Sequence, residues 1–427
     1  MDVAAFDRTT SDRAGVDDPS WLAARRLAAV EQFAAMEMPS SQEESWRYLD
    51  LDFAFEDFSP ADSGSDPLPT DALIGVGPIT AATRIVDGRP IDLPMEADGY
   101  SLSPLSVAST EHETAVRSLL DRIPAVGDRF AAAHEAFGGD GALLRVEKGA
   151  AIPDPFFVDV QGTAPGVAHF PRTMVVVEEG AEASVVVHYR SPLSFKQLAV
   201  PHVAIAAGPA AQVSVTIIQN WGYETRAIGR AYMVVERDAS VRLAEAGLGG
   251  RLSRLRLDAD LEGQGSEVNV LGAYFGDNHQ TMDYRYFIRH VGRNTRSDMF
   301  LKGAVEDEAL SVFTGLIRIE DDAQKTEAFQ TNRNLILSEG AAAQSVPNLE
   351  ILANDVKCGH GSTVGPLDDE QRYYLMSRGL PRERADRLQV RGFFEQALAR
   401  FPTAAVVAPV REWVNDKYVQ AQQAGRV

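Results

Sequence analysis

The chain has 427 residues, with 61 acidic and 41 basic side chains, a net charge of −20 and a hydrophobic content of 45%. The apolar content excludes a disordered chain. The acidic excess argues against binding to nucleic acid or anionic membranes, because both need clustered Lys and Arg. The single cysteine, Cys358, excludes an intramolecular disulfide and a zinc site made of several thiolates. A lone thiol fits a reducing compartment, and residues 1–18 lack the basic and apolar pattern of a secretory peptide, so we expect a cytoplasmic protein.

Residues 1–140 are predicted to form an N-terminal region of helices and loops. Apolar residues at helical spacing predict a helix over 21–36, and a weaker helical stretch covers 111–136. His112-Glu113 and His134-Glu135 lack the second histidine that would complete a local zinc motif. We therefore expect both histidines to lie on helix surfaces.

Residues 141–365 contain short Val- and Ala-rich runs separated by turn residues at regular intervals. The turns recur every 27 to 31 residues, at Gly149, Gly180, Gly208, Asp238 and Gly265. A strand–turn–strand unit that repeats every ~30 residues is typical of a solenoid. The pattern predicts a mainly β protein with a β-helix core, and a β-sandwich is the alternative. The uncharged run 197–223 is interpreted as buried strands, because internal Pro and Gly residues interrupt it.

Residues 366–427 are predicted to be helical again. Asp368 can cap a first helix and Gly379 can end it with a positive φ. Pro381 suits the first turn of a second helix, and Pro409 is predicted to start the last one.

Most enzyme signatures are absent from the sequence. It contains no P-loop, no H-E-x-x-H, no C-x-x-C and no G-x-S-x-G motif. The acidic clusters 306–308 and 320–322 are expected to be solvated turns, with a divalent-cation site as the alternative. His279 and His290 are expected to be structural histidines.

The segment 349–365 is the most unusual, because it combines Cys358 and His360 at the end of the strand repeats. In an extended backbone, residues two apart share one face. A thiolate and an imidazole can bind a soft transition metal or an iron–sulfur unit, and Lys357 could favour the thiolate. Two ligands do not close a site, so others would come from elsewhere in the chain or from a partner. The alternative is a buried Cys and a hydrogen-bonded His.

The region 315–394 resembles the SufB/SufD family of iron–sulfur cluster assembly proteins. The similarity is dense over about 80 residues, far more than one short motif. The residues after the motif histidine, Gly361-Ser362-Thr363, resemble the SufD form rather than SufB. The N-terminal segment 43–48 is also similar to SufD. The matching elements are 313–315, 330–335, 347–351, 355–361, 373–379 and 392–393.

The resemblance implies a right-handed parallel β-helix between N- and C-terminal helical parts. It implies a non-catalytic scaffold in a complex with a SufB-like subunit, bound through the β-helix, and a SufC-like ATPase, bound through 366–427. His360 would lie at the SufB–SufD interface and hold a transient iron–sulfur cluster with a ligand from the partner, whereas the role of Cys358 stays open. The isolated chain would carry no cofactor of its own and could form a homodimer. Whether FAD binds such a complex is left open.

Two alternatives remain on the sequence alone. One is a SufB-like paralogue. The other is a carbohydrate-active β-helix enzyme, which would need two positioned carboxylates on one face, and the sequence does not reveal such a pair.

Overall fold

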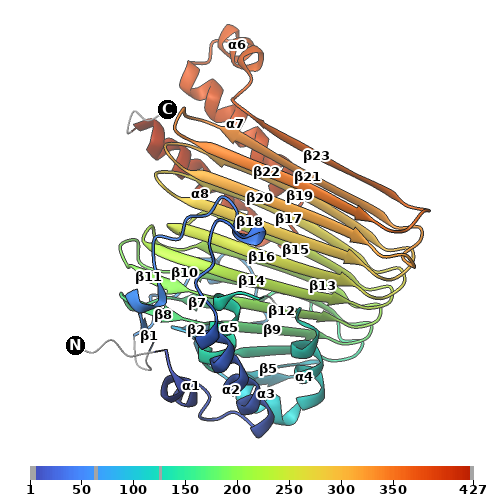
Figure 1. Cartoon of the computed structure of the whole chain (residues 1–427). Helices are drawn as coiled ribbons and strands as arrows, with labels where there is room; N and C mark the ends of the chain where they lie inside the picture. The colour runs from blue at the N-terminus through green and yellow to red at the C-terminus, as the bar shows by residue number, and fades with distance from the viewer. Residues whose placement is uncertain (1–5, 62–65, 125–126, 424–427) are drawn as a thin grey trace.

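A parallel β-solenoid lies at the centre of the computed structural model, which describes residues 6–61, 66–124 and 127–423 (Figure 1). From β12 (His202–Ala207) onward the strands alternate between two sheets, so each coil contributes one strand to each sheet. Thr281 pairs with Leu252 on one side and Leu310 on the other, each 29 residues away in the chain. The ladders between coils are parallel, which confirms the β-helix and excludes the antiparallel sandwich.

The two sheets contain all 23 strands of the described residues. The 13-stranded sheet has the row β4 (Met95–Ala97), β5 (Tyr100–Pro104), β6 (Ala142–Val146), β9 (Arg172–Val177), β12 (His202–Ala207), β14 (Thr225–Val235), β16 (Leu252–Leu261), β18 (Thr281–His290), β20 (Leu310–Ile319) and β22 (Ala342–Ile351), with β1 (Ser59–Pro60), β8 (Val167–His169) and β11 (Gln197–Ala199) beside it. The 10-stranded sheet has the row β3 (Arg89–Ile91), β2 (Ala81–Val86), β7 (Phe156–Gln161), β10 (Glu182–Arg190), β13 (Gln212–Asn220), β15 (Ser240–Gly247), β17 (Glu267–Gly276), β19 (Arg296–Val305), β21 (Glu327–Ile336) and β23 (Lys357–Gly365).

Helices cover the outer faces of the sheets. The N-terminal helices pack on the 13-stranded sheet through clusters that include Phe33, Phe137 and Phe170. The C-terminal helices pack on the 10-stranded sheet, where Phe394 lies against Phe275. The helices are α1 (Arg8–Ala14), α2 (Ser20–Ala35), α3 (Leu105–Glu111), α4 (Glu113–Arg122), α5 (Arg129–Phe137), α6 (Asp369–Ser377), α7 (Arg382–Leu398) and α8 (Ala404–Gln423), with 3-10 turns at Glu44–Trp46, Phe55–Asp57 and Ala72–Gly75.

The core lies between the two sheets and is built from every second residue of each strand. One aliphatic ladder in the 10-stranded sheet runs through successive coils, and each member is buried: Val185, Val215, Leu243, Val270 and Met299. The turns between strands lie at the predicted positions, and most of them use a residue with a positive φ. Gly149, Gly180, Asp238 and Gly265 have positive φ, whereas Ala210 takes this conformation beside Gly208.

The helical predictions need two corrections. The N-terminal region also contains strands β2 to β5, which continue both sheets and were not predicted. These strands have only three to six residues, too few for a clear alternating pattern. The last helix begins at Ala404 rather than at Pro409, which lies inside it. In contrast, Asp368 caps α6 and Gly379 follows it with a φ of 90°, as predicted.

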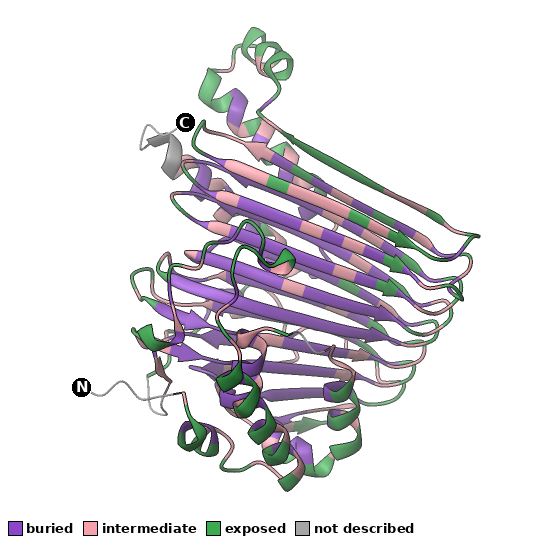
Figure 2. Ribbon diagram, viewed as in Figure 1, coloured by how far each residue is buried: buried purple, intermediate pink, exposed green. Residues whose placement is uncertain are grey.

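The solenoid is open at its C-terminal end. β22 and β23 are the last strands of their sheets, and each is paired on one side only. Figure 2 shows the middle strands buried and these last two strands partly or fully exposed. No further coil within the described residues covers the interior at this end.

Candidate functional site at the open end of the β-solenoid

His360 lies on β23 and occupies the last position of the aliphatic ladder. Its register neighbour on β21 is Gln330, which is itself the neighbour of Met299. Gln330 is buried and His360 is exposed, although both lie on the face that points into the solenoid in earlier coils. The imidazole is therefore accessible only because the last coil has no successor.

Three amide side chains lie at alternate positions of β21, the strand that pairs with β23: Gln330, Asn332 and Asn334. Tyr274 donates to Asn334 Oδ1 at 2.6 Å, and Asn332 Nδ2 donates to the Tyr274 hydroxyl at 3.1 Å. Gln330 Nε2 donates to the Asn348 carbonyl at 2.8 Å, whereas its Oε1 is buried without a donor among the described residues. Residues two apart on a strand share one face, so these three side chains point inward, and Asn334 Nδ2 donates to Asn332 Oδ1 at 2.7 Å.

Cys358 lies two residues before His360 on the same face of β23. It is a free, half-buried thiol beside Ala328, and it packs against the core. Lys357 was expected to favour a thiolate here, but adjacent strand residues point to opposite faces. The Lys357 ammonium instead pairs with Glu327 at 2.9 Å, so its charge interacts with that carboxylate and not with the Cys358 thiol.

Cys358 and His360 do not gather a third ligand. Within residues 6–61, 66–124 and 127–423, the one group of three His, Cys, Asp or Glu side chains close enough to hold a metal lies elsewhere. A closed metal site at His360 would therefore need ligands from another molecule.

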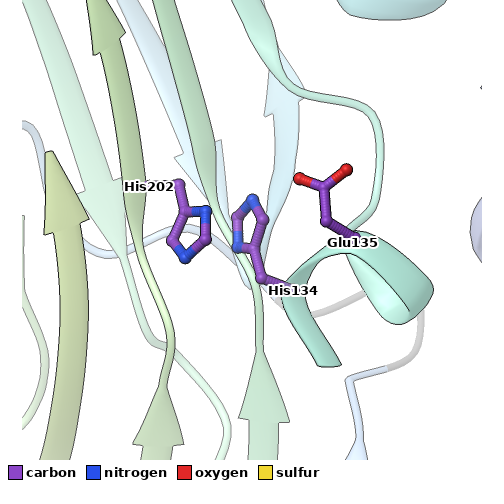
Figure 3. Close-up of side chains that lie close together, drawn as sticks. All are labelled: His134, Glu135 and His202. Carbon is purple, nitrogen blue, oxygen red and sulfur yellow. The ribbon is translucent and has the colours of Figure 1, made fainter. Parts of the chain in front are cut away.

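That group consists of His134, Glu135 and His202, and it corrects the expectation that His134 lies on a helix surface (Figure 3). His134 is fully buried, and its ring stacks on that of His202 with a centroid distance of 3.5 Å. His202 comes from β12, 68 residues further along the chain. A sequence motif cannot reveal such a ligand, although the apolar residues all around α5 are a sign of a buried helix.

The contacts of this cluster indicate a structural role rather than a metal site. His134 Nδ1 donates to the Val200 carbonyl at 2.8 Å, and His134 Nε2 accepts from Arg172 at 3.0 Å. Glu135 pairs with Arg25 at 2.9 Å and with Arg172 at 2.8 Å. Burial and the nearby Arg172 lower the pKa of His134 to about 3. A metal cation would have to displace these bonds and approach the positively charged Arg172. The bonds from His134 and Glu135 to Val200 and Arg172 instead stabilise the packing of α5 against the sheet.

The structure confirms some of the remaining predictions about histidines and acidic clusters and corrects others. His290 is buried between Thr295 and Ser297, at 2.8 and 2.9 Å, which confirms a structural histidine. His279 is exposed and pairs with Glu308. Asp321 and Asp322 are exposed, as expected for a solvated turn. Glu306 was expected to be solvated as well, but it is fully buried close to Lys417 of α8.

None of the helices in the described part of the chain combines the length and the apolar character that crossing a membrane would require.

The fold and the site together define a class: a two-sheet parallel β-solenoid with an open end that presents a histidine. A family model described as "SUF system FeS cluster assembly, SufBD core domain" matches residues 160–393. An iron–sulfur cluster assembly SufBD family protein of Mycobacterium tuberculosis is 32% identical over 287 residues, which are 65% of this chain and 71% of the relative. The chain therefore belongs to the SufBD family of iron–sulfur cluster assembly proteins.

Two further relatives match over most of their length. The iron–sulfur cluster assembly protein SufD of Bacillus subtilis is 26% identical over 404 residues, which are 91% of this chain and 92% of the relative. SufD of Escherichia coli is 26% identical over 370 residues, 85% of each chain. Membership of this family indicates a role in iron–sulfur cluster assembly. None of these matches supports the alternative of a carbohydrate-active β-helix enzyme.

Proposed function

We propose that the chain is a SufD-like, non-catalytic scaffold subunit of a cytoplasmic complex that assembles iron–sulfur clusters. The observation that carries this proposal is the last coil, where His360 and Cys358 lie on the inward face at an end that no part of the described chain covers. The two relatives named SufD, which match over most of their length, favour this role over that of a SufB-like paralogue.

The open end is the proposed contact for a SufB-like subunit. β22 and β23 offer unpaired backbone groups along nine to ten residues, and such edges are templates for pairing with another chain. Large apolar side chains are exposed here as well, namely Phe329, Ile351, Leu352 and Val364. The same surface would pair two copies of this chain when no partner is present.

The iron–sulfur cluster is the cargo in this proposal and not a resident cofactor. A neutral imidazole is a good iron ligand. His360 would supply one ligand from this chain, and the partner would supply the rest. An interface between two solenoid ends would keep water away from the labile cluster.

The C-terminal helices are the proposed contact for a SufC-like ATPase. α7 and α8 pack on the 10-stranded sheet, whereas α6 has no buried residue and exposes Tyr373, Tyr374 and Met376. The chain has no P-loop, so ATP would be hydrolysed by the partner. The motion of the ATPase would reach the scaffold through α6.

The test replaces His360 with Ala in cells that depend on this pathway. We expect His360→Ala to form the complex with SufB- and SufC-like partners, measured by size-exclusion chromatography, but to lose most cluster assembly. The matched control is His279→Ala, which removes an exposed histidine from the turn before β18, a strand that does not lie at the edge of its sheet. Full complementation by His360→Ala would refute the ligand role, and loss of the complex would make His360 a structural residue.

A further inference from the structure

A cavity of about 520 Å³ lies between the outer face of the 10-stranded sheet and the helices α6 and α7. Its size is that of small-molecule sites. Strands β19, β21 and β23 provide one wall, and the two helices provide the other. The apolar part of the wall comes from Leu335, Leu367, Leu375, Leu388 and Phe393.

Lys302 on β19 lines this cavity and is only 2% exposed. Its ammonium lies 4.0 Å from the centre of the Phe393 ring, and no carboxylate within the described residues pairs with it. Lys417, the other buried lysine, pairs with Asp277 and donates to the Leu248 carbonyl and to Gln280. Buried charges are normally paired with an opposite charge. The Lys302 ammonium lacks such a counterion among the described residues.

A second cation lies beside Lys302. Arg333 of β21 is its register neighbour, lines the same cavity and has no ion pair in the part of the chain that the structure describes. Burial first, and then Arg333, lower the pKa of Lys302 to about 8. Lys302 therefore remains mainly protonated at neutral pH, and two adjacent positive charges face the cavity in a chain whose net charge is −20.

Among the polar side chains that line the cavity, Gln389 offers a donor that is not used elsewhere in the described chain. Gln389 Oε1 accepts from the Asp368 amide at 3.1 Å, but its Nε2 is buried without an acceptor among the described residues. Asp368 is the one carboxylate lining the cavity. It caps α6 by accepting from the amides of Glu370 and Gln371, at 2.9 and 3.0 Å, and it forms no ion pair with Lys302.

We propose that this cavity binds a small organic anion that carries a phosphate group. The phosphate would lie on Lys302 and Arg333, and the organic part would lie on the leucines and Phe393. A phosphate fits better than a carboxylate, because it has enough oxygens to accept from both cations and from Gln389 together. The site goes beyond the scaffold role and does not depend on His360, which lies on the opposite face of β23 from the cavity residue Thr363.

The experiment titrates the full chain with phenyl phosphate by calorimetry, with phenol and benzoate as comparison probes. We expect saturable binding of phenyl phosphate, weaker binding of benzoate and none of phenol. Lys302→Met and Arg333→Gln should each weaken binding by about tenfold or more. The matched control is Arg293→Gln, which removes an exposed arginine without a described ion pair in the turn between β18 and β19.

Arg333 is exposed, so Arg333→Gln disturbs no packed group. A change in binding by this variant is therefore not caused by a change in folding. Circular dichroism melting of Lys302→Met checks that the buried substitution is folded. Equal binding of phenyl phosphate to wild type and Arg333→Gln would overturn the proposal. Equal binding of benzoate and phenyl phosphate would overturn the phosphate assignment, and the absence of saturable binding would overturn the site. The His360→Ala complementation test is separate from each of these results.

Discussion

The Tyr286 hydroxyl donates a hydrogen bond to the Glu245 carboxylate in the interior of the solenoid. Gln219 Nε2 donates to the other oxygen at 2.5 Å, and no basic side chain within the described residues pairs with this carboxylate. Burial raises the pKa of Glu245 to about 7 despite these bonds. The solenoid therefore contains an acid that binds its proton more tightly in the folded state than in the unfolded chain.

The first prediction concerns Glu245→Gln and pH. Because the folded pKa is raised from 4.5 to about 7, the contribution of Glu245 is fully present below pH 4.5 and is lost as the pH rises through about 7. Relative to wild type, the variant should gain about 3 kcal/mol in the free energy of unfolding between about pH 4 and about pH 8. Urea unfolding at several pH values measures this gain. Glu339→Gln, in an exposed turn, should show no such trend, and a constant difference for Glu245→Gln would contradict the prediction.

The second prediction concerns Lys417→Met at the junction of α8 and the solenoid. Lys417 Nζ lies 2.7 Å from Asp277 Oδ1, and both side chains are nearly buried. Removing the cation leaves Asp277 unpaired, so we expect a loss of about 3 to 5 kcal/mol in the free energy of unfolding. Chemical denaturation measures the loss. Adding Asp277→Asn should recover part of it, and a double variant as unstable as the sum of the two single variants would show that the pair is not coupled.

The third prediction concerns the exposed face of α6. Tyr373 is 76% exposed, so Tyr373→Ser should leave the stability of the chain nearly unchanged. If α6 is the ATPase contact, affinity for the SufC-like partner should fall by about tenfold or more. Surface plasmon resonance with the purified partner measures the affinity. Leu193→Ser, which removes an equally exposed apolar residue elsewhere, should bind normally.

The fourth prediction separates Cys358 from His360. Cys358 packs partly against the core, so Cys358→Ala should cost about 1 kcal/mol in stability. We expect Cys358→Ala to retain most cluster assembly in the complementation assay in which His360→Ala fails. Equal loss of activity in both variants, with the complex intact, would instead assign a ligand role to the thiol.

The sequence predicted the solenoid because each coil repeats the same local pattern. Turn residues with positive φ, such as Gly180 and Gly265, recur at the spacing of one coil and are visible without any long-range information. The short strands β3 and β4 carry no such signal, since three residues cannot show an alternating pattern. They are strands because neighbouring strands pair with them.

The candidate site was predictable only in part. The position of Cys358 and His360 on one strand followed from their spacing, but their exposure depends on the absence of a further coil. Glu306 was placed at the surface because Asp307 and Glu308 follow it, and His134 was placed there because no second histidine completes a local motif. Glu306 is buried by α8, whose Lys417 is more than a hundred residues away, and His134 meets His202 of β12. Such partners are set by tertiary packing and cannot be inferred from local sequence.

The two ends of the solenoid differ, and this asymmetry limits how chains can assemble. At the N-terminal end the sheets finish in the three-residue antiparallel strands β3 and β4, which offer little backbone for further pairing. At the other end, β22 and β23 are long, and each has one unpaired edge. If two solenoids joined through β22 and β23, only the ends with the short strands β3 and β4 would face outward. Such a contact would close on itself, and assembly would stop at a pair instead of extending into a fibre.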